Sequence, residues 1–306
     1  MTKPTMFRVN EFFYPSSEIV NTYGIPTYKE ANPALFTTIS FPFLFGVMFG
    51  DIMHGAILFF WGVYLCFGNR KNPNSITGAL GPYRYLFVLM GLFSFFCGLV
   101  YNDFSSLGTQ TFGKTCFSVI EQGKHHDEYA HKLDKNCVYP FGIDPIWYRS
   151  TQEISYMNSF KMKISVIYGV VQMLFGTVLK GMNAAYFKRW NELIFEVATQ
   201  VILMVVLFGF MDYMIILKWV TDWSTLKNGQ VAPGIISTMI VMFINFGSAP
   251  KESKDAPLIS NQTEWMRAFL IIAVFCIPIM LLAKPIIESK KSKKDVYDDF
   301  ERQENS

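Results

Sequence analysis

An aspartate and a histidine interrupt one of the most apolar stretches of this chain. Asp51 and His54 lie within residues 41–68, among phenylalanines, leucines and methionines. Residues three apart share one face of a helix, so the two side chains can hydrogen-bond. A carboxylate beside an imidazole can pass protons, because both groups can titrate near neutral pH once they are buried. The alternative is that both residues cap helix ends at a turn, and the spacing alone favours that interpretation.

Two lysines open a second apolar stretch. Lys161 and Lys163 stand where the run 163–179 begins. The simpler interpretation is snorkelling, in which the ammonium groups reach the membrane surface while their stems pack on apolar neighbours. Ser165, Tyr168 and Gln172 continue a polar set into the run, and this set would fit a water-filled cavity.

A third polar set belongs to the run 193–217. Glu192 and Glu196 stand one turn apart at its start, and Thr199 and Gln200 follow. The positive end of a helix dipole favours carboxylates at this position, which explains the two glutamates without any transport role. Glu196 and Gln200 remain candidates for the lining of a polar path.

The elements that must position these side chains are apolar helices. The chain has 306 residues, of which 51% are hydrophobic and 17% charged, and this composition is too apolar for an ordinary soluble domain. A helix crosses a bilayer with about 20 apolar residues, and strands of a membrane barrel would alternate in polarity, which these runs do not. We therefore expect an all-α polytopic bundle of about six transmembrane helices. The apolar runs are 35–50, 52–68, 84–101, 163–179, 193–217, 232–247 and 266–283.

Basic residues predict the orientation of the bundle. Lysines and arginines gather in the linkers 69–83 and 180–192 and in the C-terminal tail, which the positive-inside rule places in the cytoplasm. That assignment requires one of the last three runs not to cross, and 232–247 is the best candidate for an interfacial or re-entrant helix. The expected segments are 1–34 cytoplasmic, 35–101 with three spans, 102–162 lumenal, 163–217 with two spans, 218–265 lumenal, 266–284 as the sixth span and 285–306 cytoplasmic.

The long polar loop carries further candidates. Cys116 and Cys137 can form a disulfide if the loop faces an oxidising lumen, and two free thiols are the alternative. His125, His126 and His131 lie near acidic residues, but a solvated loop explains them more simply than a metal site. The sequon at Asn261 is a possible glycosylation site on the expected lumenal side. The chain shows no P-loop, nucleophile elbow or HExxH motif, so we expect neither catalysis nor a cofactor.

Long motifs carry a resemblance to a known family. The stretches "YGIPTYKEANPALFTTISFPFLFGVMFGDIMHG" (23–55), "YRYLFVLMGLFSFFCGLVYNDF" (83–104) and "NSFKMKISVIYGVVQMLFG" (158–176) resemble the membrane domain of the vacuolar-type proton ATPase subunit a. Later stretches, among them "LFGFMDYMIILKW" (207–219), match as well, so the resemblance covers roughly residues 20–286.

The resemblance implies a function. In this family subunit a is the stator partner of a rotating proteolipid c-ring, and it provides half-channels through which protons reach the ring carboxylates while ATP is hydrolysed elsewhere in the complex. Asp51 and one of Lys161 and Lys163 look like residues on the lumenal side of that path, with His54 implicated less strongly. The implied partners are the c-ring, other Vo subunits and the V1 peripheral stalk. The implied location is the membrane of an acidic organelle, such as a vacuole, lysosome, endosome or contractile vacuole.

Two departures from the family pattern shape the expectation. Family members carry a large cytoplasmic domain before this region and two long helices after it, whose arginines face the ring. The sequence is then expected to be a piece of a longer protein, a separately encoded part of the subunit or a reduced paralogue. If it works in a proton pump, the ring contact would need another chain, and this chain would support proton translocation without conducting protons alone. A non-conducting assembly or scaffold paralogue and a stand-alone channel or transporter are the alternatives.

Overall fold

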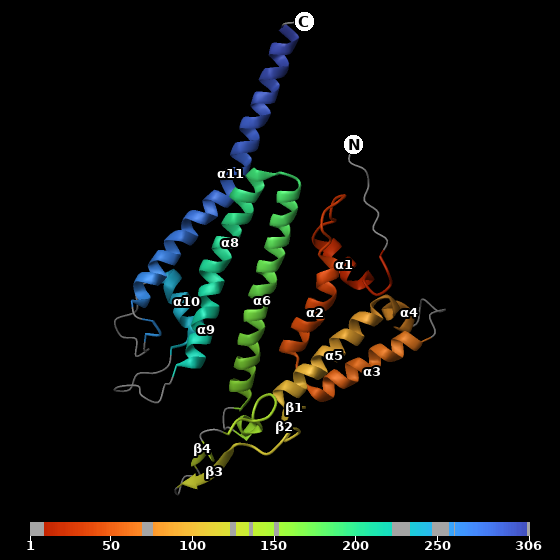
Figure 1. Cartoon of the computed structure of the whole chain (residues 1–306), viewed down its shortest axis with the longest axis vertical. Coiled ribbons are helices and arrows are strands. Elements are labelled where there is room, and N and C mark those ends of the chain that lie inside the picture. The colour runs from red at the N-terminus through yellow and green to blue at the C-terminus, as the bar shows by residue number, and fades with distance from the viewer. Residues whose placement is uncertain are drawn as a thin grey trace. The chain divides into compact units, whose positions relative to one another are not determined.

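A computed structural model describes residues 9–68, 76–122, 127–134, 137–149, 153–221, 233–246, 257–259 and 261–304. The chain divides into two compact units, Met1–Gly169 and Val170–Ser306, here called unit 1 and unit 2. Helices dominate both units (Figure 1), as the composition predicted. The expectation of an all-α membrane bundle is confirmed.

Three apolar helices form the centre of unit 1. They are α2 (Ala34–Met48), α3 (Ile52–Phe67) and α5 (Arg84–Tyr101), and α3 lies alongside α5 in Figure 1. Glycines allow the close approach of α3 and α5: a Cβ atom on Gly91 would lie 2.3 Å from the Phe59 backbone nitrogen, and one on Gly55 would lie 2.4 Å from that of Phe95. Small residues at such contacts are the usual means of packing helices tightly in a membrane.

The end of α5 nearest to the α2–α3 break is held by polar and apolar contacts. The Tyr101 hydroxyl donates to the Val47 carbonyl at 2.7 Å, and the Ser94 hydroxyl donates to the Phe49 carbonyl at 2.9 Å. Val47, Cys97 and Tyr101 form a buried cluster that Phe43, Val100, Ile143, Phe160 and Ile164 cover. These contacts fix the position of the backbone around Gly50 and Asp51 relative to the residues that follow α5.

Short elements flank the three helices. Before them lies α1 (Tyr14–Tyr23), and between α3 and α5 lie α4 (Ile76–Leu80) and the 3-10 turn η1 (Gly81–Tyr83). After α5, β1 (Asp103–Phe104) pairs with β2 (Leu107–Gly108), and β3 (Phe117–Gln122) pairs with β4 (Asp127–Lys132), both antiparallel. The 3-10 helix η2 (Pro145–Arg149) follows. The polar loop between the spans therefore contains two small hairpins that the hydropathy pattern did not predict.

Helix α6 (Glu153–Tyr186) begins in unit 1 and ends in unit 2. It starts ten residues before the apolar run at 163, because its first turns are polar and a hydropathy pattern does not detect them. In unit 2 the stretch Trp190–Val220 is continuously helical and comprises α7 (Trp190–Glu192), η3 (Leu193–Ala198), α8 (Thr199–Met204), η4 (Val205–Gly209) and α9 (Phe210–Val220). Its η3 and η4 segments are π-helical, a form that interrupts the regular α-helical ladder. The remaining helices are α10 (Ile235–Ile244) and α11 (Gln262–Glu304), and α11 packs against α8.

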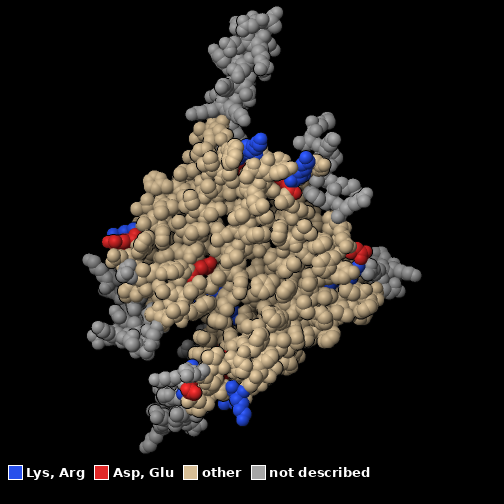
Figure 2. All heavy atoms as spheres, in the orientation of Figure 1, with Lys and Arg blue, Asp and Glu red and all other residues tan. Residues whose placement is uncertain are grey.

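Four helices in the described part of the chain are long and apolar enough to cross a membrane. They are Thr77–Tyr101, Tyr156–Tyr186, Trp190–Val220 and Gln262–Ile287. The apolar helices α2, α3 and α10 are shorter, with 15, 16 and 10 residues. Each of these helices is therefore short of the roughly 20 residues that a bilayer crossing takes. Figure 2 shows a face on which charged side chains are sparse, as expected for a surface in contact with lipid.

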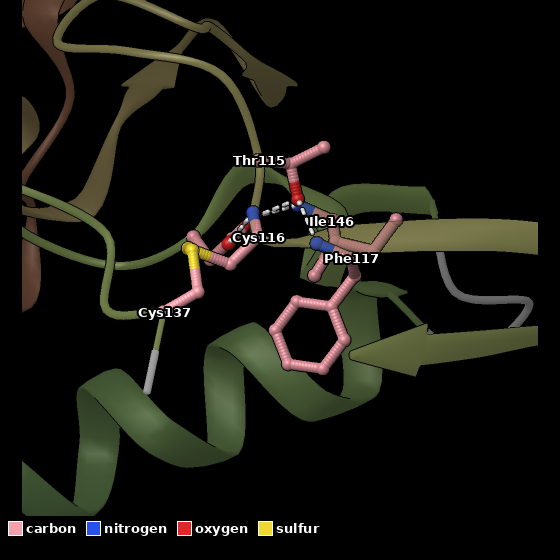
Figure 3. The surroundings of a disulfide bond; sticks show 6 residues. Thr115, Cys116, Phe117, Cys137 and Ile146 are labelled. Carbon is pink, nitrogen blue, oxygen red and sulfur yellow. Dashed lines mark hydrogen bonds between the residues drawn. A yellow bond between two sulfur atoms is a disulfide. The ribbon is translucent and has the colours of Figure 1, made fainter. Parts of the chain in front are cut away.

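A disulfide and a buried carboxylate stabilise the loop between α5 and α6. Cys116 and Cys137 are joined, with their Cα atoms 5.8 Å apart. Next to the bond the Asp144 carboxylate accepts hydrogen bonds from the Thr115 hydroxyl at 2.6 Å, the Cys116 amide at 3.0 Å and the Ile146 amide at 3.0 Å. Figure 3 shows Thr115, Cys116 and Ile146 grouped beside the sulfur bridge. The sequence analysis identified the cysteine pair but did not identify Asp144.

Removing the disulfide should loosen this loop. The bond closes a loop over a sequence separation of 21, and cross-links of that length contribute about 3 kcal/mol, mainly by restricting the unfolded chain. We expect the double variant Cys116→Ser/Cys137→Ser to be cleaved faster between α5 and α6 in limited proteolysis. Reductant should accelerate cleavage of the unmodified chain and of a Cys66→Ser control but not of the double variant. Alkylation of both cysteines in the unreduced chain would contradict the prediction.

Candidate functional site

Asp51 is the first residue of the candidate site and lies at the break between α2 and α3. Its extended backbone, with φ −152° and ψ 134°, makes it the N-cap of α3. One carboxylate oxygen, Oδ1, accepts from the Met53 amide at 3.1 Å and from the Ser105 amide at 2.9 Å, and the other, Oδ2, contacts Nδ1 of His54. The capping role and the Asp51–His54 pair, which the sequence posed as alternatives, therefore occur together.

The Asp51 side chain is only 13% exposed, and both of its carboxylate oxygens have hydrogen-bond partners, which offset the cost of burying a charged group. His54, whose side chain is 53% exposed, connects the carboxylate to solvent. The pair thus joins a hydrogen-bonded carboxylate to an imidazole ring that water can reach.

Lys161 provides the second part of the site. Its Nζ donates to Oδ2 of Asp103 at 2.5 Å and to the Gly50 carbonyl at 3.0 Å, and it lies 5.1 Å from the centre of the Tyr101 ring. The side chains of Lys161 and Asp103 are only 14% and 8% exposed. A lysine that extends along the helix to the membrane surface would be solvated, so snorkelling does not describe Lys161.

These two groups converge on one turn, residues 103–106. Oδ1 of Asp103 accepts from the Ser106 amide at 2.8 Å, while Asp51 holds the Ser105 amide. Ser105 and Ser106 both have positive φ, 54° and 64°, which is uncommon for residues other than glycine. The two carboxylates therefore hold a turn that would otherwise be unfavourable. We call Gly50, Asp51, His54, Asp103, Ser105 and Lys161 the Asp51 cluster.

Other predicted residues lie outside this cluster. Lys163 is half-buried, and within the described ranges no partner is found for it. The Ser165 hydroxyl donates to the Lys161 carbonyl at 2.8 Å, so it serves its own helix. In unit 2, Glu196 accepts a hydrogen bond from Lys180, while Gln172 and Gln200 are half-buried.

Sequence reasoning missed two buried aspartates in or near the spans. Asp103 lies two residues after the apolar run that ends at Tyr101, and its position near that run was the available signal. Asp212 is buried in α9, and its Oδ1 has no hydrogen-bond partner among the described residues.

The loop histidines form no metal site within the described residues. His125 and His126 lie outside the described residues, and His131 belongs to β4. Within the ranges that the structure describes, no group of three or more histidine, cysteine or acidic side chains could hold a metal ion.

The fold and the cluster together define a polytopic α-helical membrane protein whose ionisable groups gather at a break between two apolar helices. In a comparison with protein families, the V-type ATPase 116kDa subunit family matches residues 1–306. The chain belongs to this family, so the resemblance drawn from the sequence motifs is confirmed.

Similarity to individual proteins supports the same family. The chain is 36% identical over 312 residues to the human V-type proton ATPase 116 kDa subunit a 4, covering 95% of this chain and 36% of the relative. It is 39% identical over 306 residues to subunit a 1 of Mus musculus, covering 94% of this chain and 36% of the relative. The chain thus spans about a third of the length of these curated relatives.

Proposed function

We propose that this chain is part of the membrane stator of a rotary V-type proton ATPase and that the Asp51 cluster contributes to the lumenal half of its proton path. The observation that carries the proposal is the solvent-accessible Asp51–His54 pair, which lies beside the buried Lys161–Asp103 pair at a break between apolar helices. Ionisable groups at such positions are costly and are usually kept for transport. Family membership supports the same role.

The Asp51–His54 pair and the Lys161–Asp103 pair would have different roles in proton transport. Asp51 and His54 exchange protons with water, because His54 is exposed and Asp51 faces it. Lys161 and Asp103 are each other's partners, so they hold the turn and set the local field without needing to release a proton. In this proposal the chain is a non-catalytic subunit, and ATP hydrolysis takes place elsewhere in the complex.

Family membership suggests the partner subunits and the membrane in which the chain works. The partners would be a proteolipid c-ring, other Vo subunits, the V1 peripheral stalk and, if the subunit is divided, a separate chain with the arginine-bearing helices. The membrane would be that of an acidic organelle. Purification from native membranes in mild detergent tests this: we expect ring subunits to co-purify, and recovery of the chain with unrelated partners only would contradict it.

A second candidate is a scaffold that binds pump components without conducting. The observation in its favour is that Asp51 caps α3 and holds Ser105, which are purely structural tasks. The two functions differ in whether the charge of Asp51 matters once its hydrogen bonds are kept.

The substitution Asp51→Asn separates these functions. The asparagine Oδ1 can still accept from the Met53 and Ser105 amides, but the side chain carries no charge and cannot take up and release a proton. In membrane vesicles we expect ATP-driven acidification to fall about 100-fold, the lower end of what a positioned proton-transfer group contributes, with the amount of assembled complex unchanged.

Glu18→Gln is the matched control, because it removes the same charge from an exposed position on α1. It should acidify vesicles at the unmodified rate. If Asp51→Asn acidifies equally well in an assembled complex, the conducting role is wrong and the scaffold role is supported.

A further inference from the structure

A pocket at the opposite end of α5 is separate from the Asp51 cluster. It has a volume of about 380 Å³ and is lined by Val9, Glu11, Tyr14, Gly78, Gly81, Pro82 and Arg84. Helix α5 has 18 residues and is therefore about 27 Å long, so the pocket at its first residue is far from Asp103 at its other end. Pockets of about 300–1,000 Å³ commonly hold small ligands.

The wall of this pocket contains a buried arginine with one unmet hydrogen-bond donor. The Arg84 side chain is 5% exposed, its Nη2 donates to Glu11, and its guanidinium lies 4.6 Å from the centre of the Tyr85 ring. Its Nε is buried and has no hydrogen-bond partner among the described residues. Leaving a buried donor unpaired is unfavourable, so a ligand that pairs with Nε would bind more tightly.

Glu11 is a weak ion-pair partner of Arg84. Its side chain is 68% exposed, so water competes for it, and it uses Nη2 but not Nε. Nε itself is not exposed to the pocket, so the guanidinium must turn when Glu11 leaves. A phosphate group can then accept from Nε and a terminal guanidinium nitrogen at once, in the bidentate geometry for which arginine is suited. Such a group would satisfy the donor that Glu11 leaves unmet.

The position and the walls of the pocket indicate which kind of phosphate-bearing molecule would bind. Arg84 lies near the start of the candidate span Thr77–Tyr101, at a membrane edge where headgroups are concentrated. Val9, Tyr14 and Pro82 offer apolar surface for the first carbons of the acyl chains. We propose that the pocket binds the phosphate of an anionic phospholipid, which displaces Glu11 from Arg84.

The experiment uses the purified chain in phosphatidylcholine nanodiscs with and without phosphatidic acid. Native mass spectrometry measures retained lipid, and thermal unfolding measures stabilisation. We expect the unmodified chain to retain phosphatidic acid over phosphatidylcholine, and Glu11→Gln to retain it about tenfold more tightly, because the internal competitor is gone; tenfold corresponds to about 1.4 kcal/mol. Equal or weaker retention by Glu11→Gln would overturn the proposal.

Two further variants complete the test. Arg84→Gln should lose the preference for phosphatidic acid, whereas Arg189→Gln, which removes an arginine before another span, should keep it. Should Arg84→Gln fail to fold, Glu11→Gln still decides, because its effect has the opposite sign and leaves the arginine in place. If inorganic phosphate stabilises Glu11→Gln as strongly as phosphatidic acid does, the lipid assignment is wrong. None of these measurements depends on proton pumping.

Discussion

Replacing Lys161 by methionine should lower the free energy of unfolding by about 3–5 kcal/mol, the usual cost of removing one partner from a buried ion pair. The reason is the environment of Asp103, whose side chain is 8% exposed and which would remain as an uncompensated carboxylate. The Gly50 carbonyl would lose its donor from Lys161 as well. Thermal and denaturant unfolding of the purified protein in mild detergent measures the loss.

Two comparisons make this result specific. Lys163→Met removes the same charge two residues away from a half-buried position and should change stability by less than about 0.5 kcal/mol. The double variant Lys161→Met/Asp103→Leu should recover part of the loss, because it leaves no buried charge behind, although the Ser106 amide loses its acceptor. Equal effects of Lys161→Met and Lys163→Met would contradict the buried pair.

The double variant also tests whether the Lys161–Asp103 pair exchanges protons. If it assembles and acidifies vesicles, neither residue takes part in proton transfer, as proposed. If it assembles with the stability of the unmodified chain but does not acidify them, the assignment of a purely structural role to the pair is wrong.

The second large effect is expected at Gly91 on α5. The Cβ atom of an alanine there would lie 2.3 Å from the backbone nitrogen of Phe59 and 2.5 Å from its Cα atom. Overpacking of a core commonly costs about 1–3 kcal/mol, and a clash with backbone cannot be relieved by a rotamer change. We therefore expect Gly91→Ala to separate α3 from α5 and to cost at least about 3 kcal/mol.

Gly176→Ala is the control for Gly91→Ala. Gly176 lies within α6, and a Cβ atom added there meets nothing within 4 Å. Because alanine is favoured over glycine in a helix by up to about 1 kcal/mol, this variant should be neutral or slightly stabilised. Unfolding midpoints of the two variants, measured side by side, check the prediction. A Gly91→Ala variant as stable as Gly176→Ala would show that α3 and α5 are not in close contact.

Local pattern determined the apolar helices of this protein. The apolar run 84–101 and helix α5, Arg84–Tyr101, coincide, because a long run of apolar side chains has few stable alternatives to a helix in lipid. The Asp51–His54 contact was also accessible from the sequence, since residues three apart on a helix are neighbours. Long motifs then identified the family, which the comparison confirms.

The tertiary structure alone decided which charges meet. Lys161 and Asp103 are 58 residues apart in sequence, and no periodic pattern connects them. Two residues apart on a helix correspond to a rotation of about 200°, so Lys161 and Lys163 point to different sides, and only packing could determine which of them reaches Asp103. The sequence thus specified the helices and the ionisable residues near their ends. Long-range packing around Gly50 and the turn 103–106 selected Lys161 as the partner of Asp103 and brought that pair beside Asp51.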